Sequence, residues 1–278
     1  MKFAGVVVLY NPDSKIINNI ESYLEYLDKL YIVDNSEECC NCVKNIREDL
    51  NRYQIEYIWM GENVGIARAI NVAAQRALQE RYEWLLTMDQ DSSFKTNILN
   101  IYSEFILKNR RDDVAILSPL YLTDRKCDIA KGKYESVYWT MQSANLVNLT
   151  IYSEVGGFDE SYFIDCVDYE YCLRVKKNGC TIIRCNEAIL NHNPAITREI
   201  CIFRKKYKYG YASPIRIYYQ VRNALYMFRK YHNIHSIQIV IIKFAKILLL
   251  FDNKKMFLNY FFMAMNDCIK NISGKKEI

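Results

Sequence analysis

The chain has 278 residues, 51% of them hydrophobic, which is enough for one sizeable core or for a core with a smaller satellite domain. Its ten cysteines are scattered and residues 3–10 resemble a core strand more than a secretion signal, so we expect a cytoplasmic protein without a disulfide framework. The net charge of +5 is unevenly distributed: residues 1–200 hold 22 basic and 29 acidic side chains, whereas residues 201–278 hold 15 basic and 3 acidic ones. The basic part contains no nucleic-acid motif, so we rank nucleic acid last among its expected partners.

Strands and helices alternate along the first third of the chain. Apolar runs predict four strands, at residues 3–10, 30–33, 55–59 and 84–88. Apolar residues at helical spacing predict the intervening helices, at residues 16–27, 43–50 and 64–78. This alternation predicts an α/β fold with a parallel, doubly wound sheet. Right-handed crossovers place the carboxyl ends of its strands at one edge, where ligands bind in such folds.

Beyond residue 91 the pattern is mixed. We expect strands at 114–117, 136–141 and 181–184, short helices at 151–155 and 169–177, and helices from about residue 215 to the end. The change of charge and pattern divides the chain into a catalytic domain, residues 1–205, and a basic helical region, residues 206–278.

The basic region contains an apolar run at 237–251 that is interrupted by Lys243 and Lys246. A helix that spans a membrane needs about 20 apolar residues, so we expect no such span here. Two interpretations remain open: a helix docked on the catalytic domain, or a helix lying on an anionic membrane surface at the inner face of the plasma membrane.

Asp89-Gln90-Asp91 directly follows the fourth predicted strand. Alternate residues of a strand point the same way, so both carboxylates can converge on one cation. Carboxylate oxygens suit Mg²⁺ or Mn²⁺, which in turn bind a diphosphate. A solvated turn is the competing interpretation of an isolated Asp-X-Asp, and the position at a strand end in this topology favours the metal.

Other polar residues follow the same edge. Asp34 ends the second strand and could accept hydrogen bonds from a base or ribose, or could form only a turn. Asn63 precedes Gly65 and Arg68 at the start of a helix, where phosphate can bind, although the same pattern also marks an ordinary helix start.

Two further residues are candidates for catalysis. Asp168 opens a predicted helix and could deprotonate an acceptor hydroxyl, cap the helix, or do both; Asp165 and Glu170 are its rivals. His192 lies between two asparagines and could be a third metal ligand, a pyrophosphate contact or a structural residue.

Taken together, these segments resemble glycosyltransferase family 2, and within it the rhamnosyltransferase-like branch. The matching segments run in chain order: VVVLYNP (6–12), VDNS (33–36), NVGIARAIN (63–71), LTMDQDS (86–92), VGGFDESYFIDCVDYEYCLR (155–174), His192 and YYQVRN (218–223). The resemblance implies a GT-A fold, which is a Rossmann-like, mostly parallel sheet flanked by helices, here with a C-terminal helical region.

The resemblance also implies roles for single residues. Asn11, Asp34 and Asn63 would lie by the nucleotide base. Asp89 would face the ribose and diphosphate, and Asp91 would coordinate the metal.

On the catalytic side, Asp168 matches the presumed base and His192 a histidine near the pyrophosphate. Arg222 matches an arginine that could stabilise the leaving diphosphate. Two positions depart from the family pattern, since Val167 stands where a Glu is common and Ala144 where Gly is expected.

The implied reaction is an inverting, metal-dependent transfer of a sugar, with dTDP-rhamnose as the donor, in cell-surface polysaccharide synthesis. The acceptor would be a saccharide or a lipid-linked saccharide. Three alternatives remain open at this point: a UDP-hexose donor, a nucleotidyltransferase on a similar sheet, and a non-catalytic binding module. The first strand is followed by LYNPDSK, without the Gly-rich loop that a nucleotidyltransferase would show, and the combination of Asp89, Asp91 and Asp168 favours catalysis.

Overall fold

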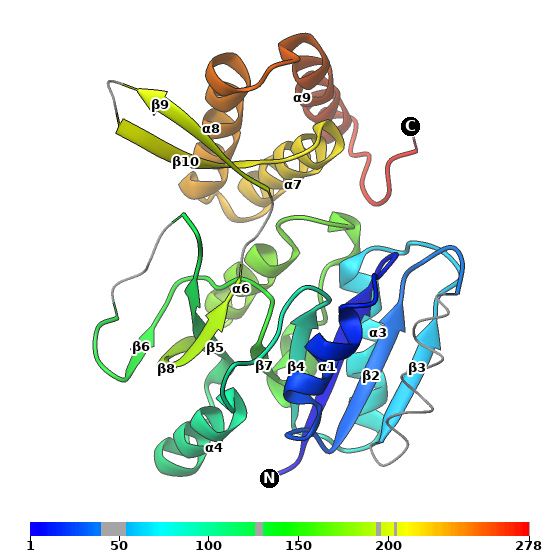
Figure 1. Ribbon diagram of the computed structural model, residues 1–278, viewed down its shortest axis with the longest axis vertical. Coiled ribbons are helices and arrows are strands. Elements are labelled where there is room, and N and C mark those ends of the chain that lie inside the picture. The colour runs from blue at the N-terminus through cyan, green and yellow to red at the C-terminus, as the bar shows by residue number, and fades with distance from the viewer. Residues whose placement is uncertain (40–53, 126–129, 193–195, 203–204, 278) are drawn as a thin grey trace.

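An eight-stranded sheet forms the centre of the computed structural model, which describes residues 1–39, 54–125, 130–192, 196–202 and 205–277 (Figure 1). The strands lie in the order β3-β2-β1-β4-β7-β5-β8-β6. Their bounds are β1 Phe3–Leu9, β2 Lys29–Asp34, β3 Ile55–Trp59, β4 Trp84–Asp89, β5 Val114–Leu122, β6 Tyr134–Ser136, β7 Asn145–Asn148 and β8 Thr181–Asn191. Six of these strands run parallel, and β7 and β6 run against them.

The register of the central strands brings two predicted site residues to the same edge. Strand β1 is parallel to β2 with Leu9 opposite Asp34, and parallel to β4 with Val8 opposite Asp89. The apolar residues of these strands are buried on both faces, as expected for the inner strands of a covered parallel sheet. The predicted convergence at the carboxyl edge is therefore confirmed.

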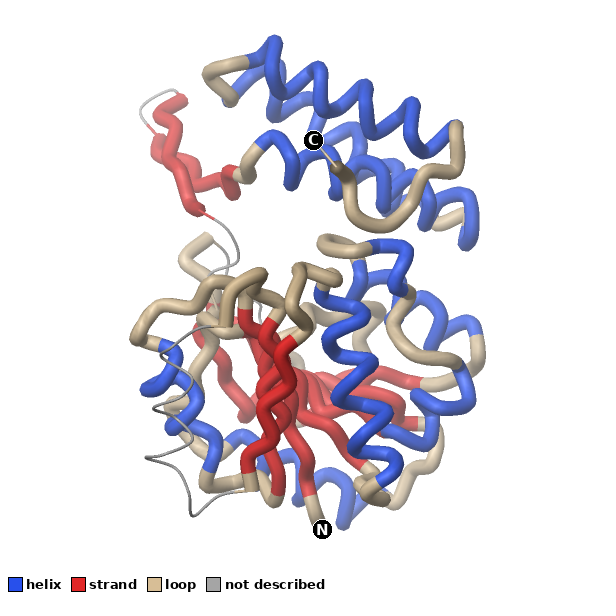
Figure 2. The backbone as a smooth tube through the Cα atoms, turned by 90° about the vertical axis from the view of Figure 1, so that its right-hand side faces the viewer, coloured by secondary structure: helices blue, strands red, loops and turns tan. Residues whose placement is uncertain are grey.

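Helices cover both faces of the sheet (Figures 1 and 2). Residues of α1 (Ile16–Leu24) and α4 (Ile98–Asn109) belong to the core on one face. Residues of α3 (Ile66–Gln79), α5 (Leu149–Val155) and α6 (Val167–Lys177) belong to the core on the other. Small side chains such as Ala67, Ala73 and Ala74 are fully buried along α3, which lets this helix approach the strands closely.

A second unit lies above the carboxyl edge of the sheet (Figures 1 and 2). It consists of the hairpin β9 (Ile196–Ile202) and β10 (Lys205–Tyr211) and the helices α7 (Pro214–Tyr231), α8 (Ile234–Leu250) and α9 (Lys254–Ile269). Phe163 from the catalytic part joins the apolar core of these helices. Within the described residues, no helix is long and apolar enough to cross a membrane.

The structure corrects several details of the sequence interpretation. The strand expected at 136–141 is wrong, because β6 ends at Ser136 and the apolar residues that follow form a loop. The hairpin was not predicted, and the expected boundary at 205/206 falls inside it, since β10 begins at Lys205. The helix expected at 43–50 lies outside the described residues.

Candidate active site

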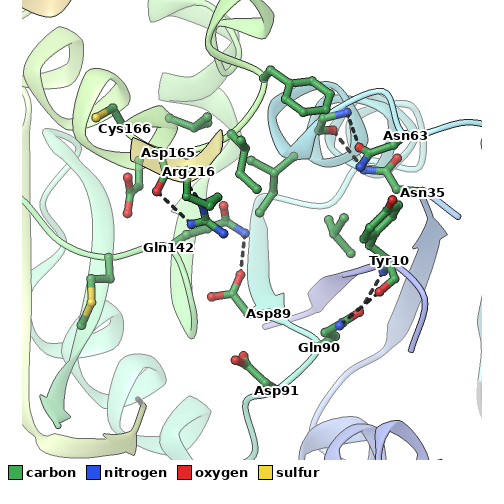
Figure 3. A pocket seen from close by; sticks show the side chains of 18 of the residues that line it. Tyr10, Asn35, Asn63, Asp89, Gln90, Asp91, Gln142, Asp165, Cys166 and Arg216 are labelled. Atoms are coloured by element: carbon green, nitrogen blue, oxygen red, sulfur yellow. Dashed lines mark hydrogen bonds and ion pairs between the residues drawn. The ribbon is translucent and has the colours of Figure 1, made fainter. Parts of the chain in front are cut away.

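A pocket of about 410 Å³ opens at the carboxyl edge of the sheet, and Figure 3 shows the side chains that line it. Five of the predicted site residues line it: Asn63, Asp89, Asp91, Asp168 and His192. They come from segments between residues 63 and 192 of the sequence, and the fold alone brings them together. The pocket is therefore the candidate active site.

Asp89, Asp91 and His192 form a cluster at the end of β4. One ligand atom of each lies within 4.8 Å of the others, and His192 Nε2 is 3.9 Å from Asp89 Oδ2. His192 is fixed from behind, since its Nδ1 lies 3.2 Å from Ser92 Oγ and its backbone N–H donates to the carbonyl of Leu122. Two carboxylates and one imidazole are a donor set that fits Mn²⁺ or Mg²⁺, with the imidazole favouring Mn²⁺.

The electrostatics of this cluster also favour a bound divalent cation. Burial, together with the negative charge of Asp91, raises the pKa of Asp89 to about 7. Burial also lowers the pKa of His192, which disfavours an imidazolium as the counter-ion of the carboxylates. A bound divalent cation would reverse the penalty on the Asp89 carboxylate, because an opposite charge at coordination distance favours the ionised form.

Asp168 lies on the α6 side of the same pocket. The helix begins at Val167 after Cys166, which has a φ of 64°, so Asp168 occupies the first turn and is not the cap that the sequence suggested. Its Oδ1 accepts a hydrogen bond of 2.8 Å from the backbone N–H of Tyr169. Burial is the main cause that raises the pKa of Asp168 to about 6, with smaller contributions from Asp89 and Asp165. Such a carboxyl is still ionised at pH 7 and is a stronger base than an ordinary aspartate.

The two rival carboxylates are held by cations. Asp165 accepts two hydrogen bonds from Arg216, at 2.6 and 2.8 Å. Glu170 is fully buried and forms ion pairs with Arg174 and Lys230, and it does not line the pocket. Neither is as available to a substrate hydroxyl as Asp168.

Arg216 is a pocket residue that the sequence interpretation missed. It lies in the first turn of α7 and lines the pocket beside Asp165, to which it is paired (Figure 3). Its positive charge also acts on Asp89 and lowers the pKa of that carboxyl, against the larger effect of burial. A guanidinium at this position can offset negative charge on a bound diphosphate. Its only signal in the sequence is its place at the start of a helix in the basic region.

Comparison with known proteins decides the family. The sequence profile of Glycosyl transferase family 2 matches residues 6–147, a little over half of the chain. The chain belongs to glycosyl transferase family 2. This membership decides against the nucleotidyltransferase alternative, and the enzyme is a glycosyltransferase.

Among curated proteins, the transferase is 28% identical over 299 residues to the dTDP-rhamnosyl transferase RfbF of Shigella flexneri, covering 97% of this chain and 96% of the relative. Among solved structures, it is similar to GalNAc-T7 with UDP, GalNAc and Mn²⁺, with a TM-score of 0.62 and 12% identity over 98% of this chain. It spans only 57% of that longer chain. It is also similar to the mannosyltransferase PcManGT of Pyrobaculum calidifontis in complex with GDP-Man and Mn²⁺, with a TM-score of 0.60, 11% identity, and coverage of 97% and 87%. The solved structures share the GT-A fold, which confirms the fold expected from the sequence.

The residues expected around the nucleotide lie at different depths in the transferase. Asp34 is fully buried and accepts hydrogen bonds from Tyr57 Oη (2.7 Å) and from the backbone N–H of Ser36. The next residue, Asn35, lines the pocket instead. Asn11, with a φ of 45°, is tied through its N–H to Ser36 Oγ, and its neighbour Tyr10 lines the pocket. At these two positions the structure therefore places the neighbouring residue, and not the predicted one, in the pocket lining.

Asn63 does line the pocket of the transferase, and its Oδ1 accepts a hydrogen bond from the N–H of Gly65. Gly65 has a φ of 85°, and a Cβ there would lie 2.6 Å from Phe163, so only glycine fits. Arg68, three residues later, is exposed on α3 and is not part of the pocket lining. Ala144, at the position where glycine was expected, has a φ of 60°, a backbone conformation that glycine adopts with less strain than alanine.

The prediction for Arg222 needs correction, because the structure does not bring this residue to the pocket. Arg222 is fully buried, with its guanidinium donating to the carbonyl of Gly274 (2.9 Å) and to Tyr218 Oη (3.3 Å). Arg216 and Arg222 are about 1.7 helical turns apart, so they face different sides of α7. Arg222 ties α7 to the C-terminal segment, and Arg216 is the arginine of α7 that lines the pocket.

This correction predicts a stability effect. Arg222→Ala removes a buried cation and leaves the Gly274 carbonyl without that donor, so we expect the free energy of unfolding to fall by about 3 kcal/mol. Urea denaturation followed by circular dichroism measures this loss, with Lys255→Ala at an exposed site of α9 as the matched control. A fully stable Arg222→Ala enzyme that has lost transfer would return Arg222 to the catalytic role.

Proposed function

We propose that this glycosyltransferase moves rhamnose from dTDP-rhamnose to an acceptor hydroxyl, with inversion at the anomeric carbon and with a divalent cation, in the synthesis of a cell-surface polysaccharide. One observation carries the proposal: a carboxylate-imidazole cluster and the separate carboxylate of Asp168 line a single pocket at the sheet edge. The donor assignment rests on the similarity to a dTDP-rhamnosyl transferase over nearly the whole chain.

In the proposed reaction, Asp89, Asp91 and His192 would hold Mn²⁺ or Mg²⁺, and the bound cation would supply positive charge against the donor diphosphate. Asp168 accepts the proton of the acceptor hydroxyl while that oxygen attacks the anomeric carbon. The bond between the anomeric carbon and the diphosphate oxygen breaks, and its electron pair leaves with dTDP. Arg216 supplies a further positive charge beside the leaving group. Attack from the side opposite the diphosphate inverts the configuration.

The fold alone does not decide the donor, since two of the similar solved structures hold different nucleotides, UDP in one and GDP-Man in the other. We expect dTDP-rhamnose with Mn²⁺ to raise the melting temperature more than UDP-glucose, UDP-galactose or GDP-mannose, because at equal concentration the ligand that binds the native state more tightly stabilises it more. A thermal-shift series over the four donors tests this. Stabilisation by a UDP-hexose and none by dTDP-rhamnose would replace the donor and leave the reaction class intact.

We also propose that the C-terminal unit contacts an anionic membrane surface. Ile241, Leu248 and Leu249 are exposed on α8, and the hairpin strand β10 adjoining that helix carries exposed Lys205, Lys206 and Lys208. Exposed apolar side chains next to lysines are typical of interfacial helices. A lipid-linked acceptor would be presented at such a surface.

The membrane contact predicts co-sedimentation with vesicles of anionic phospholipid at low salt, with each lysine near the surface contributing about 1 kcal/mol. Neutral phosphatidylcholine vesicles and the double variant Ile241→Ser/Leu249→Ser should bind far less. If the parent enzyme stays in the supernatant with anionic vesicles at low salt, the membrane contact is wrong.

A further inference from the structure

A second cavity of about 520 Å³ adjoins the candidate active site on the α8 side. Its walls are mainly aromatic and aliphatic: Tyr138, Trp139, Tyr169, Ile239 and Ile242. It shares two lining residues with the first pocket, Cys166 and Asp168, whereas the cluster of Asp89, Asp91 and His192 lies only in the first. Asp168 therefore stands between a pocket suited to a metal diphosphate and a cavity with aromatic walls.

The aromatic walls are held in place by one asparagine. Asn233 Oδ1 accepts a hydrogen bond from Tyr169 Oη (3.4 Å), and Asn233 Nδ2 donates to Tyr138 Oη (3.1 Å). The same Oδ1 caps α8 by accepting from the backbone N–H of His235 (2.8 Å). The loop after β6, the start of α6 and the start of α8 are thus joined around the cavity.

Trp139 is the largest of the cavity's exposed wall residues, and packing accounts for only part of its surface. Its side chain is 53% exposed although it is a large aromatic, and its ring meets Tyr169 edge-on at 5.8 Å between centroids. Because this contact is edge-on, it covers only part of the Trp139 ring and leaves the rest of the indole surface exposed. Exposed aromatic surface that is held rigidly beside a candidate base indicates a ligand more than a folding role.

We propose that this cavity is the acceptor subsite and that it takes a pyranose ring whose C–H face packs against Trp139; this inference rests on the proposed function. A pyranose has an apolar C–H face and a polar rim of hydroxyls. The cavity offers the matching pair, aromatic walls together with the polar side chains of His235 and Gln238. A ring stacked on Trp139 lies next to Asp168, so one hydroxyl can come within the distance of about 2.6–3.2 Å that proton transfer to a base requires.

The cavity is also large enough for this ligand, since small-molecule sites usually enclose about 300–1,000 Å³. Its apolar end at Ile242 continues into the groove between α8 and the hairpin, because Ile242 lines both. The reducing-end substituent of the acceptor can therefore leave along α8, away from the donor.

The test follows the change in tryptophan emission that a ligand causes at Trp139. The chain has three tryptophans; Trp84 is buried, so a Trp59→Phe background leaves Trp139 as the exposed one. This enzyme, with dTDP and Mn²⁺ present, is titrated with a panel of octyl hexopyranosides and octyl 2-acetamido-2-deoxyhexopyranosides, and with octanol as the control for the alkyl chain. We expect a saturable change in emission with at least one glycoside and a much smaller one with octanol.

The dissociation constant of that glycoside, measured by calorimetry, should rise about tenfold in Trp139→Ala, as expected for loss of one aromatic stacking contact. Phe262→Ala, an equally exposed aromatic on α9 that lines neither the cavity nor the groove, should bind like the parent. Hydrolysis of dTDP-rhamnose by water should stay within about twofold in Trp139→Ala, because the donor pocket is untouched.

Three results would overturn the acceptor subsite: no glycoside changes the emission, octanol changes it as strongly, or Trp139→Ala binds as tightly as the parent. A fall of donor hydrolysis in Trp139→Ala would move the residue to the donor side and equally contradict the inference. Failure of the parent enzyme to hydrolyse dTDP-rhamnose is a separate outcome, since it contradicts the proposed donor and leaves the sugar-binding result to stand on its own.

Discussion

Asp168→Asn should slow sugar transfer by about 10²–10⁴-fold while the fold and donor binding stay near those of the parent. Asparagine keeps the size of the side chain and can still accept the hydrogen bond from the N–H of Tyr169, but it cannot take a proton. The measurement compares kcat, the melting temperature and the donor dissociation constant of the two enzymes. A purely structural role would lower the melting temperature and spare kcat.

Asp165→Asn is the matched control, three residues earlier on the same pocket wall. Its carboxylate is held by Arg216, so its loss should change the position of that guanidinium and the binding of the diphosphate more than the proton transfer. If Asp168→Asn transfers at close to the parent rate and Asp165→Asn is inactive, the base is Asp165.

Asp91→Ala should remove the dependence of donor binding on a divalent cation and weaken that binding at least about 100-fold, because the cation then keeps too few protein ligands. Asp91 is exposed, so its loss should not affect the stability of the fold. Calorimetric titration of dTDP with and without Mn²⁺ measures both effects.

Asp112→Ala removes an equally exposed carboxylate just before β5 and serves as the control. It should bind dTDP and Mn²⁺ like the parent. Binding of dTDP by Asp91→Ala that still responds fully to Mn²⁺ would show that the cation is held elsewhere.

The catalytic edge of the sheet could be predicted because it depends on local pattern and on one general rule. Four short apolar runs, each followed by polar residues, identify parallel strands, and their carboxyl ends must share an edge. The register of β1 with β2 and β4 places the ends of these strands, Asp34 and Asp89, at that edge. What the rule cannot say is the depth of each side chain, and Asp34 turned out to lie beneath the lining.

The C-terminal unit could not be predicted in the same way. Arg222 lies in a segment that resembles the family. Whether a residue of a helix faces the pocket, however, depends on where α7 begins and how it packs, and in this fold Arg216 lines the pocket and Arg222 does not. In the hairpin β9–β10, strand β10 is strongly basic, and the hairpin is tied to the helices by contacts such as Tyr211 with Phe251 and Phe257, which lie far along the chain. Such long-range packing leaves no local pattern.

The loop after β6 is another segment whose structure the local sequence pattern did not predict. Its apolar residues Val137, Tyr138, Trp139 and Met141 suggested a strand. In the fold, Tyr138 and Trp139 instead line a cavity together with residues of α6 and α8. These residues are therefore apolar because they form the wall of a cavity, and not because they belong to a sheet.

The most direct test of the account is the release of dTDP from dTDP-rhamnose by the parent enzyme, followed by chromatography with Mn²⁺, with Mg²⁺ and with excess EDTA, beside UDP-glucose and UDP-galactose. We expect release from dTDP-rhamnose with a divalent cation, with slow hydrolysis by water when no acceptor is added, and none in EDTA. Full activity in EDTA would contradict the metal site at Asp89, Asp91 and His192. Turnover of a UDP-hexose in place of dTDP-rhamnose would contradict the donor.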